Sequence, residues 1–474
     1  MRPVLLINTS FQKDVQKVYS SNPTNPPLGL LAIAASLVSA KYDVVLIDPQ
    51  IDKNYMQLIQ NELKKGVLFV GMTTFMGNNL ENTIEFSRYI KTISPDVPVV
   101  WGGPMATSAP EVCFEGKEVL VDHIVMGMGE RTILGLADAL SKGLVQIDLP
   151  NVSSRSGKRV AIRPNYFFDG HIDELPYPLL SLWERGVCQG KSIPILTSRG
   201  CPRNCAFCYN NTFIGRRKWF PRSPQNVFDE MEYWSAKFEL NNFAIIDDNF
   251  LVDPARANII LKHIAERGYH ISEISGHLDD FKPSIFDNLF SCVKLVHFSI
   301  ETASPRMQTL LNKRIDIEKA VSFMRYLTEK GITAKTNFMF GLPTETDEDL
   351  MANIRLAIEI RNISGHIRML PSIYIPQLKD DIVPKFGFDK TINFSLDAFA
   401  KLDMATNRAH YLSKEIRPWM SEDDIGFYLD FMLLWFFHFD YVVRGAQKID
   451  VEAIYRRNKR LAKLFSQVPV MSSL

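Results

Sequence analysis

The sequence predicts an α/β protein in which two series of alternating strands and helices are followed by a helical segment. Short apolar runs of strand length recur in both series, and most end in a polar or glycine-containing turn. Stretches of helical length separate these runs. Strand, helix and strand in this rhythm indicate parallel sheets, because parallel strands need a crossover connection. The 474 residues allow two to three domains.

The first series covers residues 1–145 and predicts a Rossmann-like domain with a parallel sheet. Its glycine-rich turns fall at the carboxyl ends of the strands, where ligands bind in such folds. The expected strands and helices are Val4–Ile7, Leu28–Ala40, Val44–Ile47, Leu68–Met72, Leu80–Ile93, Val97–Trp101, His123–Met126 and Thr132–Leu140. Residues 146–190 carry several prolines and glycines with little periodicity, and we expect a connector there.

The second series covers residues 191–390 and predicts a partial (β/α)6 barrel. Six units are fewer than the eight of a complete barrel. The expected strands are Ile193–Ser198, Phe243–Asp247, Ile271–His277, Lys294–Ile300, Ile332–Phe340 and Ile367–Tyr374.

Residues 391–474 predict a helical C-terminal cap that is rich in aromatic side chains, above all between Phe427 and Tyr441. The favoured interpretation is a helix that covers the open side of the barrel. A second interpretation is that the rings line an apolar pocket, which would suit a lipid-like or polycyclic substrate. A helix lying in a membrane interface is disfavoured by Asp430 and Asp440.

The composition excludes several classes of protein. The chain has 54 Lys and Arg against 53 Asp and Glu, so it has no overall positive electrostatic field that would attract nucleic acid. Six cysteines are too few for a disulfide-scaffolded secreted protein of this size. No apolar run approaches the roughly 20 residues of a transmembrane helix, and the N-terminus lacks the features of a signal peptide. We therefore expect a cytoplasmic protein with reduced thiols.

Cys201, Cys205 and Cys208 crowd into one loop after the first strand of the second series. Thiolates are the natural ligands of iron–sulfur clusters, and three of them leave one iron of a 4Fe-4S cubane open. Zinc is the alternative, but it would want a fourth ligand and usually pairs two C-x-x-C units. The sequence has no second pair, so the spacing favours the cluster.

The signature C-x-x-x-C-x-aromatic-C of this loop, with Phe207 as its aromatic residue, resembles that of the radical S-adenosylmethionine superfamily. The resemblance implies that the reduced cluster donates one electron to the sulfonium of S-adenosylmethionine. Its carbon–sulfur bond then breaks homolytically, and the resulting 5′-deoxyadenosyl radical abstracts hydrogen from a substrate. An electron donor such as flavodoxin or ferredoxin is implied as a partner.

Asp247 and Asp248 close the second barrel strand, and their carboxylates are candidates for accepting hydrogen bonds from the methionine ammonium. The alternative is a helix N-cap, because Asp253 and Pro254 follow. His277 stands where related enzymes often carry an arginine near the methionine carboxylate. It is otherwise a histidine at the end of a strand.

Two further segments resemble parts of the same superfamily. Ser299–Thr302 is similar to the segment in which a glutamate or glutamine bonds the ribose hydroxyls, which makes Glu301 a candidate. Phe338–Thr346 is similar to the F-x-x-G-L-P-G-E-T turn, with Gly341 as its first glycine and Thr344 in place of the second.

Four turns in the first series occur in a characteristic order: Asn25–Leu31, Gly71–Thr74, Trp101–Pro104 and Gly127–Glu130. Together they resemble the cobalamin-binding domain fused to one large class of radical S-adenosylmethionine enzymes. The alternatives are a Rossmann-like domain that binds nothing, or a dinucleotide site, which lacks its G-x-G-x-x-G motif here. The candidate cobalamin-binding residues are Thr73, Thr74, Gly102, Gly103, Pro104, Gly129 and Glu130.

The first histidine of the chain is His123, so the D-x-H-x-x-G motif of many cobalamin domains is missing. This pattern resembles the radical methylase and anaerobic cyclase branch. It predicts cobalamin bound base-off, with neither histidine nor benzimidazole on the cobalt.

We expect a cobalamin-dependent radical methylase that acts on an unactivated carbon of a small molecule. An anaerobic oxidative cyclase or a rearrangement enzyme is the alternative, because both use the same cofactors. A methylthio-transferase would need a second cysteine cluster, and Cys113 is the only cysteine before Cys188. A cluster- or corrinoid-binding sensor would need an output module such as a basic helix-turn-helix, which the tail does not resemble.

Overall fold

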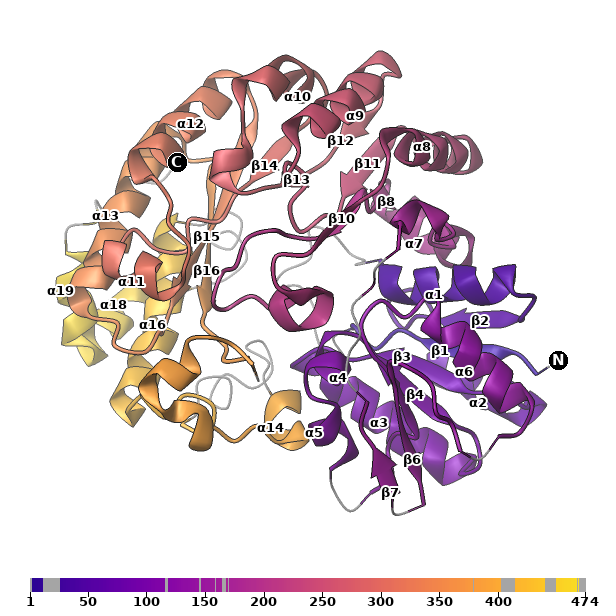
Figure 1. Cartoon of the computed structure of the whole chain (residues 1–474). Helices are drawn as coiled ribbons and strands as arrows, with labels where there is room; N and C mark the ends of the chain where they lie inside the picture. Colours follow the sequence, from indigo (N-terminus) through magenta and orange to yellow (C-terminus); the bar gives the residue numbers. More distant parts are fainter. Residues whose placement is uncertain are drawn as a thin grey trace.

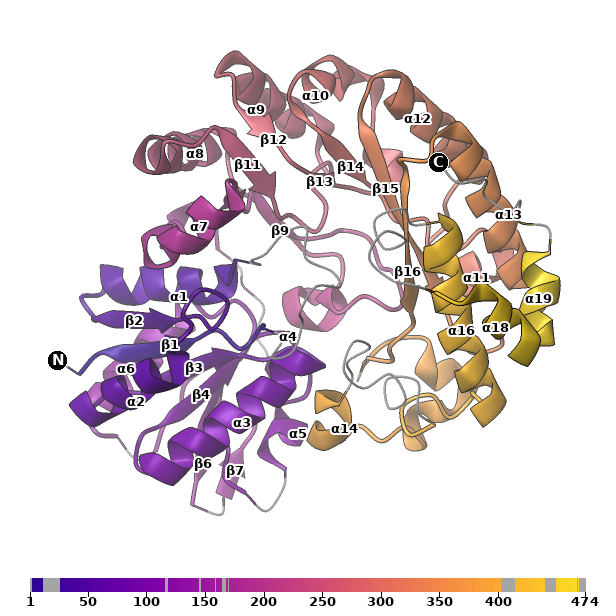
Figure 2. The same ribbon diagram turned by 180° about the vertical axis from the view of Figure 1, so that it is seen from behind.

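The structure is a computed structural model that describes residues 2–11, 26–115, 118–144, 146–157, 159–163, 168, 170–377, 379–401, 414–439, 449–466 and 468. Asn25, Asp440 and Tyr441, which entered the sequence interpretation, lie outside these residues. The chain forms two α/β halves that face one another, with the C-terminal helices beside the second half (Figures 1 and 2).

The N-terminal half is a seven-stranded sheet of order β2-β1-β3-β4-β5-β6-β7, whose first five members are parallel. Its parallel strands are β1 (Val4–Ile7), β2 (Val44–Ile47), β3 (Val70–Thr73), β4 (Val99–Gly102) and β5 (His123–Val125). Alternate strand residues point to opposite faces. The predicted Rossmann-like arrangement is confirmed.

Helices cover both faces of this sheet and complete two apolar cores. Helices α1 (Leu28–Ser39) and α6 (Thr132–Ser141) pack on the face that carries Leu6 and Val100. Helices α2 (Tyr55–Lys65) and α3 (Asn78–Ile93) pack on the other face. Two short helices, α4 (Pro104–Ser108) and α5 (Pro110–Phe114), follow β4. Helix α2 is not among the elements that the sequence pattern predicts.

The segment expected to be a connector instead extends the sheet. Strands β6 (Val152–Ser156) and β7 (Arg159–Ala161) form an antiparallel hairpin on the edge of β5. The hairpin escapes prediction because its inward side chains are largely polar and are satisfied by specific partners. His123 Nδ1, for example, lies 2.9 Å from Ser154 Oγ.

The second half contains the six predicted barrel strands, with the third strand split in two. Strands β8 (Ile193–Ile195), β11 (Asn242–Ile245) and β12 (His270–Ile271) form one sheet, and the other sheet contains β13 (Ile274–Ser275), β14 (Leu295–His297), β15 (Thr333–Phe340) and β16 (Arg368–Ile373). All neighbouring pairs are parallel. Helices α8 (Pro224–Phe238), α9 (Pro254–Glu266), α10 (Phe286–Cys292), α12 (Ile317–Glu329) and α13 (Asp347–Ile363) lie outside them (Figure 1).

The aromatic helix α16 (Glu422–Phe439) packs beside β16 and next to α18 (Val451–Arg457) and α19 (Lys459–Phe465). The ring of Trp435 lies 4.9 Å from those of both Phe338 and Phe340 on β15, and its Nε1 donates to Met369 O at 3.0 Å. These contacts agree with the favoured interpretation, in which the aromatic helix covers the barrel. Within the described ranges, no helix is long and apolar enough to cross a membrane.

One part of the predicted C-terminal cap belongs to the other half. Helix α14 (Leu396–Ala400) contacts α3, and Phe399 is buried in the core that α2 and α3 complete. The backbone N–H of Gly77 donates to Phe399 O at 2.9 Å. The chain thus returns to the N-terminal sheet after finishing the barrel.

Candidate functional site

The cysteine loop follows β9 (Ser198–Gly200), which pairs with β10 (Trp219–Pro221) on the other side of the loop. Gly200 takes a φ of 78°, and a Cβ there would stand 2.4 Å from Lys218 O. Only glycine fits such a position. In the middle of the loop, Ala206 N donates to Leu311 O at 2.9 Å and Ala206 O accepts from Asp381 N at 3.1 Å. The loop is therefore fixed from two sides.

The three thiols of the loop are half-buried and lie close enough to shift one another's pKa. Burial raises the pKa of each, to about 12 for Cys208, and the neighbouring thiol raises the pKa of Cys205 and Cys208 further. Across the described residues, no three His, Cys, Asp or Glu side chains converge tightly enough to hold a single metal ion. A zinc site would gather four donors within about 2.3 Å of one ion. Three thiolates are the donor set of a 4Fe-4S cluster that keeps one iron open.

The two aspartates at the end of β11 have different surroundings. Asp247 is buried and accepts three hydrogen bonds of 2.6 Å, from Thr197 N, Thr197 Oγ1 and Ser198 Oγ. Asp248 accepts from Gly200 N at 3.0 Å, and Tyr209 OH lies 3.4 Å from its other oxygen. Asp248 therefore connects the residue before Cys201 with the residue after Cys208. Helix α9 is capped by Asp253 instead, so the N-cap alternative does not apply to the pair.

Glu301 lies beside the cysteine loop and has an unusual backbone. Its φ is 67°, in the left-handed region, and its buried carboxylate pairs with Lys313 Nζ at 2.9 Å. Burial raises the pKa of the Cys205 thiol, while the charge of Lys313 lowers it and that of Glu301 raises it. Lys313 is a residue that sequence reasoning missed, because a lysine after a helix carries no motif.

His277 also lies near Lys313. Burial, Arg203 and Lys313 together lower the pKa of His277 to about 4, so the imidazole is neutral at pH 7. Its Nδ1 accepts from Asp279 N at 3.3 Å and caps a short 3-10 turn. This contact agrees with the interpretation of His277 as a histidine at the end of a strand, and it uses one of the two ring nitrogens.

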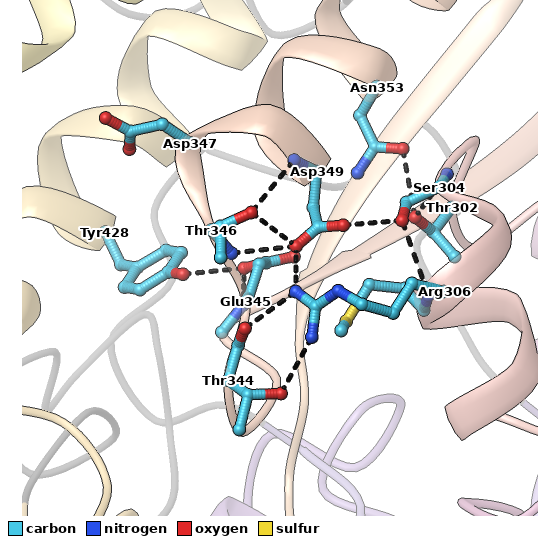
Figure 3. Close-up of polar contacts among 12 residues, drawn as sticks. Thr302, Ser304, Arg306, Thr344, Glu345, Thr346, Asp347, Asp349, Asn353 and Tyr428 are labelled. Atoms are coloured by element: carbon cyan, nitrogen blue, oxygen red, sulfur yellow. Dashed lines mark hydrogen bonds and ion pairs between the residues drawn. The ribbon is translucent and has the colours of Figure 1, made fainter.

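The turn after β15 is held by the polar network of Figure 3. Gly341 has a φ of 73° and its N–H donates to Glu345 Oε2 at 2.7 Å. Thr344, which replaces the second glycine of the related turn, has a φ of 66°. Arg306 donates to Thr344 Oγ1 at 3.0 Å and to Thr344 O at 2.7 Å, and it also pairs with Asp349. A threonine is thus held in a conformation that favours glycine.

Glu345 connects this turn to the C-terminal helix (Figure 3). Tyr428 OH on α16 donates to Glu345 Oε2 at 2.6 Å, whereas the buried Oε1 has no hydrogen-bond partner among the residues that the structure describes. Burial raises the pKa of Glu345 to about 7. The Tyr428 contact lies outside any motif and has no signal in the sequence.

A cavity of about 350 Å³ lies between the two halves. The N-terminal turns and the barrel side both contribute to its wall. The predicted cobalamin-binding residues in this wall are Thr73, Gly102, Gly103, Pro104, Gly129 and Glu130. Thr74 is the exception: its buried hydroxyl donates to Gly102 O at 2.8 Å and accepts from Ala106 N at 2.9 Å, so it shapes the turn.

Two glycines allow this wall to pack tightly. A Cβ on Gly103 would stand 2.7 Å from Thr73 Cγ2 and 3.0 Å from Thr74 O. A Cβ on Gly129 would stand 3.0 Å from Val125 Cγ1 and 3.1 Å from Ile33 Cδ1. Glycines whose Cβ positions are already occupied let the backbone approach a bulky ring closely. The turns of this wall can therefore come close to a bulky ligand.

Two family models match the chain in these same regions. Residues 18–137 match the B12 binding domain, and residues 195–357 match the radical SAM superfamily. The chain is a cobalamin-binding radical S-adenosylmethionine enzyme. Its cofactors are accordingly a 4Fe-4S cluster, S-adenosylmethionine and cobalamin.

Curated relatives of this radical S-adenosylmethionine enzyme include methyltransferases and a cyclase. An uncharacterised methyltransferase of Pyrococcus horikoshii is 26% identical over 432 residues, which are 90% of this chain and 92% of the relative. Cytidylyl-2-hydroxyethylphosphonate methyltransferase of Streptomyces wedmorensis is 25% identical over 75% of this chain and 77% of the relative. An anaerobic magnesium-protoporphyrin IX monomethyl ester cyclase of Rubrivivax gelatinosus is 25% identical and covers 70% and 62% of the two chains.

Two solved structures share the fold of the enzyme. The methyltransferase TsrM of Kitasatospora setae, solved with cobalamin and a [4Fe-4S] cluster, superimposes with a TM-score of 0.65 at 18% identity, over 80% of this chain and 74% of that one. The cobalamin-dependent enzyme OxsB, solved with aqua-cobalamin and S-adenosylmethionine, gives a TM-score of 0.62 at 17% identity, over 78% and 53%.

An ion pair joins the two cofactor regions of the enzyme. Arg199, two residues before Cys201, pairs with Glu130 at 2.6 Å, and Glu130 is only 5% exposed. Both residues line the cavity. Glu130 was a predicted cobalamin-binding residue, but its partner carries no motif and was missed.

Proposed function

We propose that this enzyme transfers a methyl group to an unactivated carbon of a small molecule. The observation that carries the proposal is the shared cavity: the N-terminal turns line one side, and Tyr209 and Asp248, which connect the ends of the cysteine loop, line the other. Radical formation and methyl delivery need neighbouring cofactors, and this arrangement supports such a placement. An electron donor and a small-molecule substrate are the partners that this chemistry requires.

Cys201, Cys205 and Cys208 are the proposed ligands of three irons, which leaves the fourth iron for the amino and carboxylate groups of S-adenosylmethionine. When bound, the reduced cluster supplies the electron that cleaves S-adenosylmethionine, and cobalamin supplies methyl transfer. Phe207, inside the loop, flanks these thiols. All six cysteines of the chain are unpaired, which fits a reducing compartment such as the cytoplasm.

Three side chains are proposed to orient S-adenosylmethionine at the mouth of the barrel. Glu301 can accept from the ribose hydroxyls, because Lys313 compensates its buried charge without occupying both oxygens. Asp248 is the candidate for the ammonium. Asp247 suits that role less well, since its three hydrogen bonds make it a positioning residue for the end of β8. The neutral His277 would hold the carboxylate less strongly than an arginine. Gly341 has no side chain, so the backbone of the turn after β15 can approach S-adenosylmethionine closely.

The inner wall of the cavity supports cobalamin bound base-off. Leu6, Phe69, Val100 and Val125 form an apolar recess of the kind that a benzimidazole would fill, and no histidine lines the described wall. His123, the first histidine, faces Ser154 at the sheet edge instead. Paramagnetic resonance of the cob(II)alamin form tests this geometry. Cobalt lines without nitrogen triplets are expected, and triplets would contradict the proposal.

Anaerobic incubation with dithionite and S-adenosylmethionine tests the reaction class. A methylase consumes one S-adenosylmethionine as radical source and a second as methyl donor. We therefore expect 5′-deoxyadenosine and S-adenosylhomocysteine together, with a product heavier by one methylene. The second candidate, an anaerobic oxidative cyclase, is favoured by the relative of that name in Rubrivivax gelatinosus. It would give 5′-deoxyadenosine without S-adenosylhomocysteine. Absence of 5′-deoxyadenosine would refute both.

A further inference from the structure

The sheet formed by β13, β14, β15 and β16 carries polar side chains on its inner face. Alternate residues of a strand point to opposite faces of the sheet. Directly after β14, the ring of Phe298 lies 5.7 Å from that of Phe323 on α12, so Phe298 faces the outer helices. His297 and Ser299, its two neighbours along the chain, therefore face inward. Ser299 Oγ lies 3.4 Å from His297 Nε2, as expected for two side chains on one face.

Four neighbouring strands each place one side chain at the same level of this inner face. The pairing register sets these residues side by side: Ser275 on β13, His297 on β14, Lys335 on β15 and Arg368 on β16. We call these four residues the inner row. In a filled barrel, the side chains at such a level are mostly bulky branched apolar groups that form a core. The inner row is polar instead, so it does not serve as a packed core.

The inner row holds more positive charge than its carboxylate neutralises. Glu273, just before β13, lies 2.8 Å from Lys335 Nζ and 3.4 Å from His297 Nδ1. Although burial opposes the shift, the hydrogen bond with His297 and the charge of Lys335 lower the pKa of Glu273 to about 2. Arg368 has no ion-pair partner in the part of the chain that the structure describes. One cation of the inner row is therefore uncompensated.

Two buried atoms on the inner face also lack a hydrogen-bond partner among the described residues. They are Nε of Arg368 and Oδ1 of Asn337, the next inward residue of β15 after Lys335. Buried polar groups without partners cost stability, so most such groups in proteins have one. The inner row is nevertheless accessible, because 17% of the His297 side chain and 18% of the Lys335 side chain are exposed. A small molecule that enters the barrel can therefore supply the partners.

We infer that the substrate carries an anionic group, a carboxylate or a phosphate, that binds Arg368 in the inner row. The planar guanidinium of an arginine donates two parallel hydrogen bonds to either anion, and Nε is one of its donors. Lys335 adds a second positive charge next to it. The inference rests on the proposed function, because the anionic molecule is taken to be the substrate that is methylated.

The depth of the inner row sets the length of this substrate. Glu301, the proposed contact of the ribose, lies about 13 Å beyond His297 along the strand direction, at roughly 3.3 Å per residue. The reacting carbon must lie near the cofactors, at the level of Glu301. The substrate is therefore an elongated molecule whose reacting carbon lies on the order of 10 Å from its anionic group.

Three short probes of equal chain length test the binding of an anion. Hexyl phosphate and hexanoate carry the two anionic groups, and hexanamide is their uncharged counterpart. Ligand-observed NMR on the full chain, loaded anaerobically with its cofactors, measures the Kd of each probe. At least one anion should bind roughly tenfold more tightly than hexanamide, and the tighter anion identifies the substrate class. Equal binding of all three probes would overturn the inference.

Substitution of Arg368 locates the site. Arg368→Gln should abolish the preference for the anion, whereas Arg355→Gln should preserve it. Arg355 is the matched control, because it is an exposed arginine on the outer helix α13. Arg368→Lys keeps the charge without the planar fork and should retain part of the preference, which maintains the test if the glutamine variant is unstable. A full preference in Arg368→Gln, or an equal loss in Arg355→Gln, would contradict binding at the inner row.

Cob(II)alamin reports the orientation of the bound probe. Its unpaired electron speeds the relaxation of nearby nuclei, and this effect falls steeply with distance. The terminal methyl group of hexyl phosphate should therefore relax faster than the methylene next to the phosphate. The reverse order would overturn the inference, because the anion would then lie at the cofactors. An enzyme that binds hexyl phosphate through Arg368 but forms no S-adenosylhomocysteine would keep the anion site and lose the proposed methyl transfer.

Discussion

The cysteine loop and the cobalamin cavity are built in opposite ways. The loop depends on atoms that are present: three thiols, and carboxylates such as Asp248 that accept hydrogen bonds from its ends. The wall of the cavity depends on atoms that are missing, because a Cβ on Gly103 or Gly129 would collide with neighbouring protein atoms. Removing a group should therefore destroy the first site, and adding one should destroy the second.

The largest expected effect is the removal of a thiol. Cys205→Ala leaves too few ligands for the cluster, so 5′-deoxyadenosine formation should fall to background and bound iron should fall with it. Iron analysis and product chromatography measure both. Cys188→Ala is the matched control, because Cys188 is an exposed free cysteine outside the loop, and it should behave like the wild type. Wild-type turnover in Cys205→Ala would exclude the cluster assignment.

The polar turn beside the loop should respond to pH through Glu345. Its pKa is raised to about 7 by burial, above its usual value near 4.5. The stability from the neutral carboxyl is therefore fully present below pH 4.5 and is lost as pH rises through 7. This loss amounts to up to about 3 kcal/mol.

Hydrogen exchange of α16, corrected for the intrinsic rate, should show weaker protection at pH 8 than at pH 5. Glu345→Gln, which cannot ionise, should remove the difference. Glu348→Gln, three residues further on and exposed, should preserve it. A pH dependence that survives in Glu345→Gln would show that another group controls α16.

Adding one methyl group should damage the cavity. In Gly129→Ala, the new Cβ would lie 3.0 Å from Val125 Cγ1 and 3.1 Å from Ile33 Cδ1. Overpacking of this kind costs about 1–3 kcal/mol of stability. Because Val125 and Ile33 also line the cavity, their displacement should lower cobalamin affinity as well, by roughly tenfold, the equivalent of about 1.4 kcal/mol. Gly135→Ala adds the same group on α6, outside the cavity wall, where the nearest atom is Leu149 Cδ1 at an ordinary contact distance of 3.4 Å, and it should bind normally. Equal affinities in anaerobic titrations of the two variants would disprove the steric argument.

The smallest expected effect concerns Thr344, a filled position where the related turn has glycine. Thr344→Ala loses the hydrogen bond from Arg306 but keeps the Cβ at a φ of 66°. Thr344→Gly loses the same bond and relieves the backbone, so it should be more stable than the alanine variant by about 1 kcal/mol. Fluorescence-detected urea unfolding can compare them, since Trp419 donates to Gly341 O in the same turn. Identical midpoints would show that the backbone is unstrained.

Sequence alone predicts the parts of the molecule that depend on residue type. The cysteine spacing identifies the loop, and apolar runs locate the five parallel strands of the first sheet and the six barrel strands. It misses β6 because buried serines such as Ser154 are satisfied by tertiary partners such as His123, and it misses β7 because all three residues of that strand are exposed. It also misses the break between β12 and β13.

The candidate site shows the same limit. Glu301 and the glycine turns follow motifs, but Lys313, Arg199 and Tyr428 come from distant segments and are recognised only when the chain is folded. Asp247 and Asp248 are adjacent in sequence and indistinguishable by type. Only the structure shows that Asp247 accepts from Thr197 and Ser198 while Asp248 faces the cavity.

Cobalamin bound in this cavity, as we propose, would contact both halves of the chain. A ligand that contacts both walls stabilises their closed arrangement by mass action, by about 2.7 kcal/mol when its concentration is a hundred times Kd. We therefore expect the protein to survive heat and proteolysis longer when corrinoid is plentiful. A shortage of the vitamin would lower the amount of enzyme as well as its activity.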